Sequence, residues 1–158
     1  MSRRLRDLVP SADGDGGNIL LVMETDGLAL EHLSPDECMR LMGSVPVGRI
    51  VYTRRALPAV ELVKFALVDG DIVIRTSAGG KLAAATRGAV VAFEADAVDV
   101  DGHAGWSVAI VGQARAETDG EEIRRLELVA LTSWVPGQHG HFIRISPRIV
   151  NGRRVGRA

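Results

Sequence analysis

The sequence predicts an α+β protein that is mainly β: a small, closed or half-closed antiparallel barrel of six strands with small flanking helices. Three observations predict this fold. After residue 46 the apolar residues recur mostly with period two, as they do in half-buried strands. Short turns rich in glycine join several of these segments, which favours antiparallel connections. Three short segments with helical character accompany the strands, a mixture typical of small barrels.

The first predicted helix begins at Ser34. This serine is a suitable N-cap, a proline follows at the first helical position, and Glu37 stands three residues after the serine. Cys38 and the apolar residues 41–42 then share one face, and Gly43 ends the helix. Because Cys38 lies in the apolar stripe of this helix and no basic partner for its thiol is evident, we interpret this cysteine as a packing residue and not as a nucleophile.

The strands are expected where the period-two pattern is clearest. The Asp-Gly-Asp turn at 69–71 predicts that the strands on either side pair as a hairpin. Gly112 predicts a bend or bulge inside the longest strand. Helices are expected at 80–87, closed by Gly88, and at 120–131. The predicted strands are 47–52, 60–68, 72–76, 90–95, 106–117 and 142–149.

The chain of 158 residues is expected to form one domain. Residues 11–18 contain glycine, asparagine and small polar residues that bury almost nothing. We therefore expect a flexible tail at 1–22 and a single domain at 23–158. The alternative is that translation starts at Met23, in which case residues 1–22 are not part of the protein.

The composition excludes several classes of function. Nineteen basic and 20 acidic side chains give a net charge of −1, and 4% of the residues are aromatic, which argues against a nucleic-acid partner. A single cysteine excludes an intramolecular disulfide and a cysteine-rich zinc site, and no metal is expected. No apolar run has the length of a membrane span, and no targeting signal is visible. We expect a cytoplasmic protein without a membrane partner.

Residues 75–81 have the composition of a phosphate-binding turn. The predicted order is strand, glycine-rich turn and helix, which would bring two cations, two hydroxyls and free backbone N–H groups together. The pattern differs from a P-loop, because arginine stands where the first glycine belongs. An ordinary turn beside a solvated helix explains the same residues equally well. The side chains concerned are Arg75, Thr76, Ser77 and Lys81.

Trp106 and Ser107 open the longest predicted strand. A tryptophan at the start of a strand most often closes the end of a barrel. The alternative is a flat wall against a ring-shaped ligand, to which the serine hydroxyl supplies one directed hydrogen bond.

The order and spacing of these motifs resemble the pyridoxamine 5′-phosphate oxidase-like family of flavin-binding split barrels. The resemblance covers roughly residues 28–155, and it depends on the shared order more than on any single motif. The segments that carry it are 34–43, 47–49, 60–65, 74–76, 80–82, 93–96, 105–108, Gly112 and 144–145.

This resemblance implies a six-stranded split barrel and a homodimer that holds FMN, or FAD or a deazaflavin, between its protomers. It further implies that residues 75–76 and Lys81 bind the phosphate, and that the backbone of 60–64 lines the flavin ring. Trp106 and Ser107 would border the ring or the ribityl chain. The residues assigned to the cofactor are Glu61, Leu62, Val63, Lys64, Arg75, Thr76, Ser77, Lys81, Trp106 and Ser107.

The chain departs from the family at 61–64, where Glu61 and Lys64 are present. Either side chain could reach the ring, or the two could pair with each other. A carboxylate would disfavour a reduced, anionic flavin, whereas a lysine would favour it. The resemblance implies an oxidoreductase acting on a small organic substrate, with no catalytic side chain assigned. A deazaflavin-dependent reductase, a non-catalytic flavin-binding module and a cofactor-free dimeric interaction protein are the alternatives.

Overall fold

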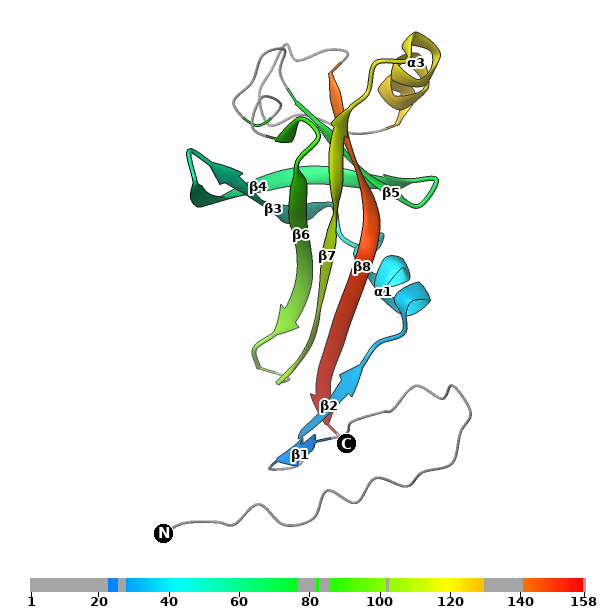
Figure 1. Ribbon diagram of the computed structural model, residues 1–158. Helices are drawn as coiled ribbons and strands as arrows, with labels where there is room; N and C mark the ends of the chain where they lie inside the picture. Colours follow the sequence, from blue (N-terminus) through cyan, green and yellow to red (C-terminus); the bar gives the residue numbers. More distant parts are fainter. Residues whose placement is uncertain are drawn as a thin grey trace, which may run out of the picture.

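One antiparallel sheet forms the barrel (Figure 1). The computed structural model describes residues 23–25, 28–76, 82, 86–101, 103–129 and 141–157. Across these residues the strand order is β1-β2-β8-β5-β4-β3-β6-β7, and pairing of β7 with β8 closes the barrel. The elements are β1 (Met23–Thr25), β2 (Leu28–His32), α1 (Pro35–Met42), β3 (Val47–Arg54), β4 (Leu57–Val68), β5 (Asp71–Arg75), β6 (Val90–Asp99), β7 (Ala104–Ala116), α3 (Gly120–Leu128) and β8 (Phe142–Arg157).

The predicted antiparallel barrel is confirmed, and its six predicted strands correspond to β3–β8. Two short strands, β1 and β2, extend the sheet beyond the prediction. The predicted turn at 69–70 joins β4 to β5, with both residues at positive φ. The tail at 1–22 and most of the helix at 80–87 lie outside the described residues; of that helix Leu82 and Thr86 are described, and both are buried.

Strand β8 is longer than predicted, because it continues from Ile149 to Arg157. Its first half pairs with β5 and its second half with β2, while β7 runs along most of its length. The predicted irregularity at Gly112 is confirmed as a register shift between Val111 and Gly112. The glycines and arginines of 151–157 do not alternate with apolar residues. The period-two pattern therefore stops before the strand does, and the predicted strand ended at 149.

Helix α1 begins and ends as predicted. The Ser34 hydroxyl accepts a hydrogen bond from the backbone N–H of Glu37 at 3.3 Å, and Pro35 is the first helical residue. Cys38 and Met42 are fully buried under the helix. Burial is the main reason why the pKa of the Cys38 thiol is raised. The interpretation of Cys38 as a packing residue is confirmed.

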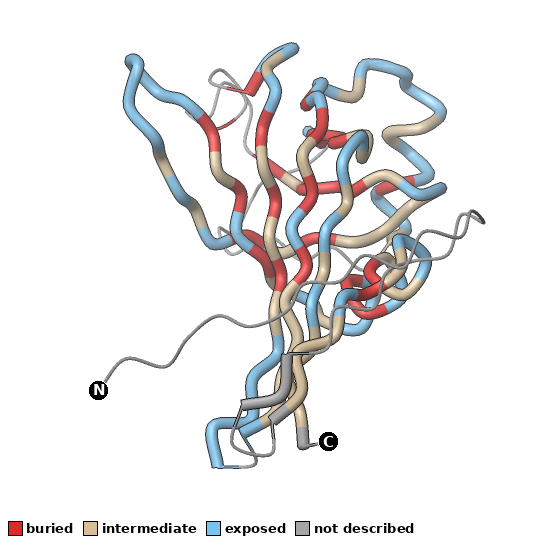
Figure 2. Tube along the Cα trace, turned by 60° about the horizontal axis from the view of Figure 1, so that its bottom comes forward, coloured by how far each residue is buried: buried red, intermediate tan, exposed pale blue. Residues whose placement is uncertain are grey.

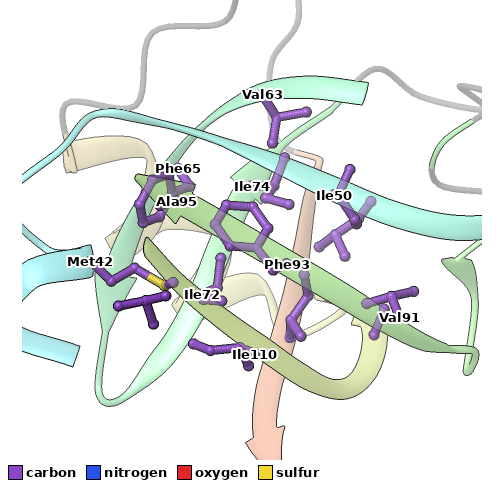
Figure 3. Close-up of a cluster of buried hydrophobic side chains, with 14 of the residues drawn as sticks. Met42, Ile50, Val63, Phe65, Ile72, Ile74, Val91, Phe93, Ala95 and Ile110 are labelled. Atoms are coloured by element: carbon purple, nitrogen blue, oxygen red, sulfur yellow. The ribbon is translucent and has the colours of Figure 1, made fainter. Parts of the chain in front are cut away.

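The main core fills the barrel with aliphatic and aromatic side chains (Figure 3). The rings of Phe65 and Phe93 meet edge to face with their centroids 4.8 Å apart. Ile50, Ile72 and Ile74 pack around them. These residues come from β3–β6, so burial of their side chains holds the hairpins of the barrel together.

Helix α3 covers a second, smaller core outside the barrel. It begins at the N-cap Asp119 and ends at Leu128, three residues earlier than predicted. Leu126 is fully buried against Val73 and Phe142.

Arg144 connects this helix to the barrel. Its Nε donates to Glu117 at 2.8 Å, and its other nitrogens pair with Glu122 and with Asp71. The arginine side chain is 7% exposed, so a buried cation is surrounded by three carboxylates.

Gly152 allows α1 to lie close to β8. A Cβ placed at this position would lie 2.4 Å from the Cys38 sulfur. We expect Gly152→Ala to lower the free energy of unfolding by about 1–3 kcal/mol, because a packed core resists overfilling. Urea denaturation measures this change. Gly156→Ala on the same strand is the control, since nothing lies within 4 Å of its added Cβ; an equal loss in both variants would contradict the close contact.

None of the helices in the described part of the chain is long and apolar enough to cross a membrane.

Candidate functional site

Alternation along β4 separates the four predicted residues of 61–64. Leu62 and Lys64 point to the outer face of the sheet, the side away from the core, and Leu62 is 55% exposed. Val63 is buried in the core, and Glu61 shares its side of the strand. Figure 2 shows how buried positions recur along the strands. A ligand on the outer face would therefore meet the side chains of Leu62 and Lys64, and of 61 and 63 only the backbone.

Glu61 has a partner of its own inside the barrel wall. The buried hydroxyl of Tyr52 donates a hydrogen bond to its carboxylate. Burial, followed by this hydrogen bond and the negative charge of Glu61, raises the pKa of Tyr52. The structure thus pairs Glu61 with Tyr52 and places it on the opposite side of β4 from Lys64.

The predicted phosphate site begins at the end of β5. The β4–β5 register pairs Phe65 with Ile74, so the next residues along, Lys64 and Arg75, lie on neighbouring strands and the same face. The Arg75 guanidinium lies over the Phe142 ring, 5.6 Å from its centroid. Thr76 is buried and its backbone N–H bonds to the carbonyl of residue 141 at 2.9 Å.

The remaining two predicted phosphate ligands, Ser77 and Lys81, lie outside the described residues. The part of the site that the structure does describe contains two cations on one face, Lys64 and Arg75. The adjacency of Lys64 and Arg75 was not predicted, because it depends on the hairpin register and not on distance along the chain.

Trp106 and Ser107 belong to an open groove of about 490 Å³ near the tip of the β6–β7 hairpin. We call this the hairpin groove. Trp106 packs against the edge of the main core and pairs with Arg154, so strand alternation puts its side chain on the opposite side of β7 from Ser107. The Arg153 guanidinium reaches into the groove, and its Nε donates to the Ser107 hydroxyl at 3.4 Å. The lining residues are Asp96, 98–100, 103–107, Arg153 and Val155.

Lys64 and Arg75, which we call the cationic strand end, lie far from the hairpin groove within one chain. Four steps across the sheet lead from Arg75 on β5 through β4, β3 and β6 to Ser107 on β7. With about 4.8 Å between strands, this route measures roughly 19 Å around the curved wall. On its other side, the sheet connects the two residues through β8. Arg75 pairs with Phe142 and Ser107 pairs with Arg153, and these two partners lie near opposite ends of that strand.

An apolar row crosses the outer face beside Leu62. The strand registers align Val60, Val51, Ala92, Val111 and Ile149 across five strands. Val60 and Ile149, at the two ends of the row, are 61% and 53% exposed. Exposed apolar side chains gathered on one face are typical of a protein interface.

A charged cluster lies next to this row. Arg49 contacts Glu94 at 2.9 Å and Asp96 at 2.8 Å. Burial raises the pKa of Glu94 and outweighs the opposing hydrogen bond from Arg49. The sequence analysis singled out neither Arg49, which forms these ion pairs, nor Arg153, which lines the hairpin groove. The only feature of the sequence that bears on Arg49 is the period-two pattern of its strand, which puts this side chain on the outer face.

In the described part of the chain, no three His, Cys, Asp or Glu side chains are grouped so that they could hold a metal ion.

Comparison with known proteins agrees with this architecture. The chain is 41% identical over 129 residues to the uncharacterized protein Rv0080 of Mycobacterium tuberculosis, which covers 78% of this chain and 84% of that protein. The FAD binding protein from Mycobacterium smegmatis superposes with a TM-score of 0.63 at 32% identity, over 80% of this chain and 98% of that chain. An FAD-binding protein from Mesorhizobium loti gives a TM-score of 0.68 at 25% identity, over 79% and 97%.

A family model covers most of the described barrel. Residues 34–154 match the model described as pyridoxamine 5′-phosphate oxidase, from the N-cap of α1 almost to the end of β8. The matched range contains every residue that the sequence assigned to the site. The chain therefore belongs to the pyridoxamine 5′-phosphate oxidase family and has its split-barrel fold.

Proposed function

We propose that this protein binds a flavin between two copies of the chain and acts as an oxidoreductase on a small organic substrate. The single observation that carries the proposal is the placement of Lys64 and Arg75 side by side on the outer face. Two cations on neighbouring strands suit the phosphate of a flavin nucleotide. The similarity to FAD-binding proteins of two bacteria supports the same class of ligand.

The residues of the outer face fit such a cofactor. Leu62 offers an exposed apolar side chain beside the cations, as the ring system of a flavin requires. Ser107 supplies a hydroxyl in the hairpin groove, where Trp106 is also a lining residue. Lys81, which follows the glycine-rich turn in the sequence, is the third proposed phosphate ligand.

A second copy of the chain is the proposed partner. The groove and the cationic strand end lie apart on one curved wall, so a ligand that touches both needs two protomers. The exposed apolar row through Val60 and Ile149 supplies a surface for that contact, because isologous dimers bury matching apolar faces.

A bound flavin would supply hydride transfer, and the protein would bind, orient and shield it. Lys64 and Arg75 would favour its anionic groups, whereas the Glu61 carboxylate is bonded to Tyr52 within the wall. The Glu61 carboxylate would therefore destabilise an anionic flavin less than its position in the segment 61–64 indicates. This placement favours an oxidoreductase over a binding module that has lost redox function.

Flavin titration tests the proposal. Purified protein is expected to quench the fluorescence of added FMN or FAD, and a deazaflavin is the third ligand to titrate. Anaerobic reduction by NADH or NADPH, followed by oxidation with a small quinone, would support the enzyme. Binding without reduction would support the non-catalytic module, and absence of any binding would leave a cofactor-free interaction protein.

Lys81→Ala is expected to weaken FMN binding by about 1–3 kcal/mol, the range for a lost charge-assisted hydrogen bond. Riboflavin has no phosphate, so its affinity should stay the same in this variant. Isothermal titration of both ligands measures the difference. Arg124→Ala, on the exposed side of α3, is the control for loss of one positive charge. If Lys81→Ala leaves the preference for FMN over riboflavin intact, this residue does not hold the phosphate.

A further inference from the structure

The hairpin groove contains an arginine that the proposed cofactor site does not use. We propose that Arg153 is a specificity-determining residue, which binds an oxyanion, phosphate or carboxylate, of a planar ligand lying against Ser107 in this groove. The identity of that ligand rests on the proposed function, since a flavin or its substrate would occupy this wall.

Arg153 is held in place without being neutralised. The register of β7 and β8 puts it directly opposite Ser107, and its Nε donates to the serine hydroxyl at 3.4 Å. No salt bridge joins Arg153 to a carboxylate among the residues that the structure describes. Its positive charge is therefore available in the groove.

Neither acidic residue of the groove forms a salt bridge with Arg153. Asp96 stands opposite Ser107 on β6, but its carboxylate contacts Arg49 at 2.8 Å. Asp99 lies nearer the hairpin tip and also has an interaction partner. Neither acid forms a salt bridge with Arg153, so an incoming anion would not have to displace an internal one.

The neighbouring arginine shows the contrast. Arg154 points to the other side of β8, where Glu37 and Glu31 contact its guanidinium at 2.9 and 3.3 Å. That arginine joins α1 and β2 to the barrel. Two adjacent arginines thus have different roles: one is neutralised by internal acids, and the other faces an open groove.

The groove around Arg153 suits a ligand that is flat and apolar at one end and anionic at the other. Val98 and Val155 form apolar walls. A guanidinium presents paired N–H donors that match the two oxygens of a carboxylate or a phosphate. Two sources carry this group: the diphosphate of a dinucleotide flavin such as FAD, and the carboxylate of a substrate.

Arg153→Ala and Arg153→Lys test the inference, with Arg148→Ala as the control. Arg148 is exposed on the same strand but does not line the groove. Isothermal titration with FAD, FMN, pyrophosphate and benzoate gives the dissociation constants. We expect Arg153→Ala to weaken the oxyanion ligand about tenfold, Arg153→Lys to restore part of the affinity, and Arg148→Ala to change it less than twofold.

The pattern of loss identifies the source of the oxyanion. Weaker FAD and pyrophosphate binding with unchanged FMN supports the diphosphate. Weaker benzoate binding to flavin-loaded protein, with unchanged FAD and FMN, supports a substrate carboxylate. Unchanged affinity for all four ligands, or an equal loss in Arg148→Ala, overturns the inference.

Failure of the proposed function gives a different result. If wild-type protein binds no flavin, pyrophosphate and benzoate can still be titrated into the flavin-free chain. A tenfold loss in Arg153→Ala would then support an anion site without a flavin. Equal affinity in wild type and variant, or absence of binding in both, would overturn the role of Arg153 itself.

Discussion

Replacing Arg144 with alanine is expected to lower the free energy of unfolding by about 3–5 kcal/mol, the range for removing one partner of a buried ion pair. Its side chain is 7% exposed and contacts Glu117, Glu122 and Asp71. Without the arginine, three carboxylates that are largely shielded from water would face one another. Because α3 joins the barrel through this cluster, its release is part of the expected effect.

Chemical denaturation at neutral pH measures the loss. Arg115→Ala is the matched control, because Arg115 contacts the same Asp71 at 3.0 Å but is 56% exposed. An exposed pair is worth less than about 1 kcal/mol, so the control should stay near wild type. Equal losses in the two variants would show that burial does not make the Arg144 cluster special.

The same cluster predicts a dependence of stability on pH. Burial raises the pKa of Glu117, but hydrogen bonds from the backbone N–H of Asp119 and from Arg144 outweigh it, so the folded-state pKa lies below the ordinary value of 4.5. This carboxylate therefore stabilises the fold above pH 4.5, and the contribution is lost as the pH falls through the lower, folded-state pKa. Between pH 7 and pH 3, the melting temperature should fall less in Arg144→Ala than in wild type, and thermal melting at both pH values measures the difference.

Local signals predicted the elements that depend on local physics. The N-cap at Ser34, the turn at 69–70 and the irregularity at Gly112 each follow from residues close together in the sequence. The length of β8 does not, since its second half is paired by β2 and β7, which supply the order that its own arginines and glycines do not indicate.

The candidate site divides in the same way. The sequence brought Arg75 and Thr76 together because they are neighbours in the chain. It could not place Lys64 beside Arg75, or Arg153 opposite Ser107, because those contacts depend on strand register. It also left open a pair between Glu61 and Lys64, which β-strand alternation puts on opposite sides.

Val60→Asp is expected to convert a dimer into a monomer. Val60 is 61% exposed and stands opposite Val51 in the apolar row, so the monomer tolerates a polar side chain there. In an isologous dimer both protomers contribute residue 60 to the same interface, so two new carboxylates would be buried among apolar neighbours. An unpaired buried charge costs several kcal/mol, which corresponds to at least a hundredfold weaker association.

Sedimentation equilibrium measures the mass of the particle against the chain mass of 16.9 kDa. We expect wild type at twice this value and Val60→Asp at the monomer value, with flavin affinity reduced at least tenfold because each protomer then has half of the site. Leu128→Asp is the control: Leu128 is 88% exposed on α3, away from the row. Circular dichroism checks that both variants fold. A Val60→Asp protein that remains dimeric and binds flavin normally would show that this face is not where two copies meet, and the apolar row would then have no part in holding the cofactor.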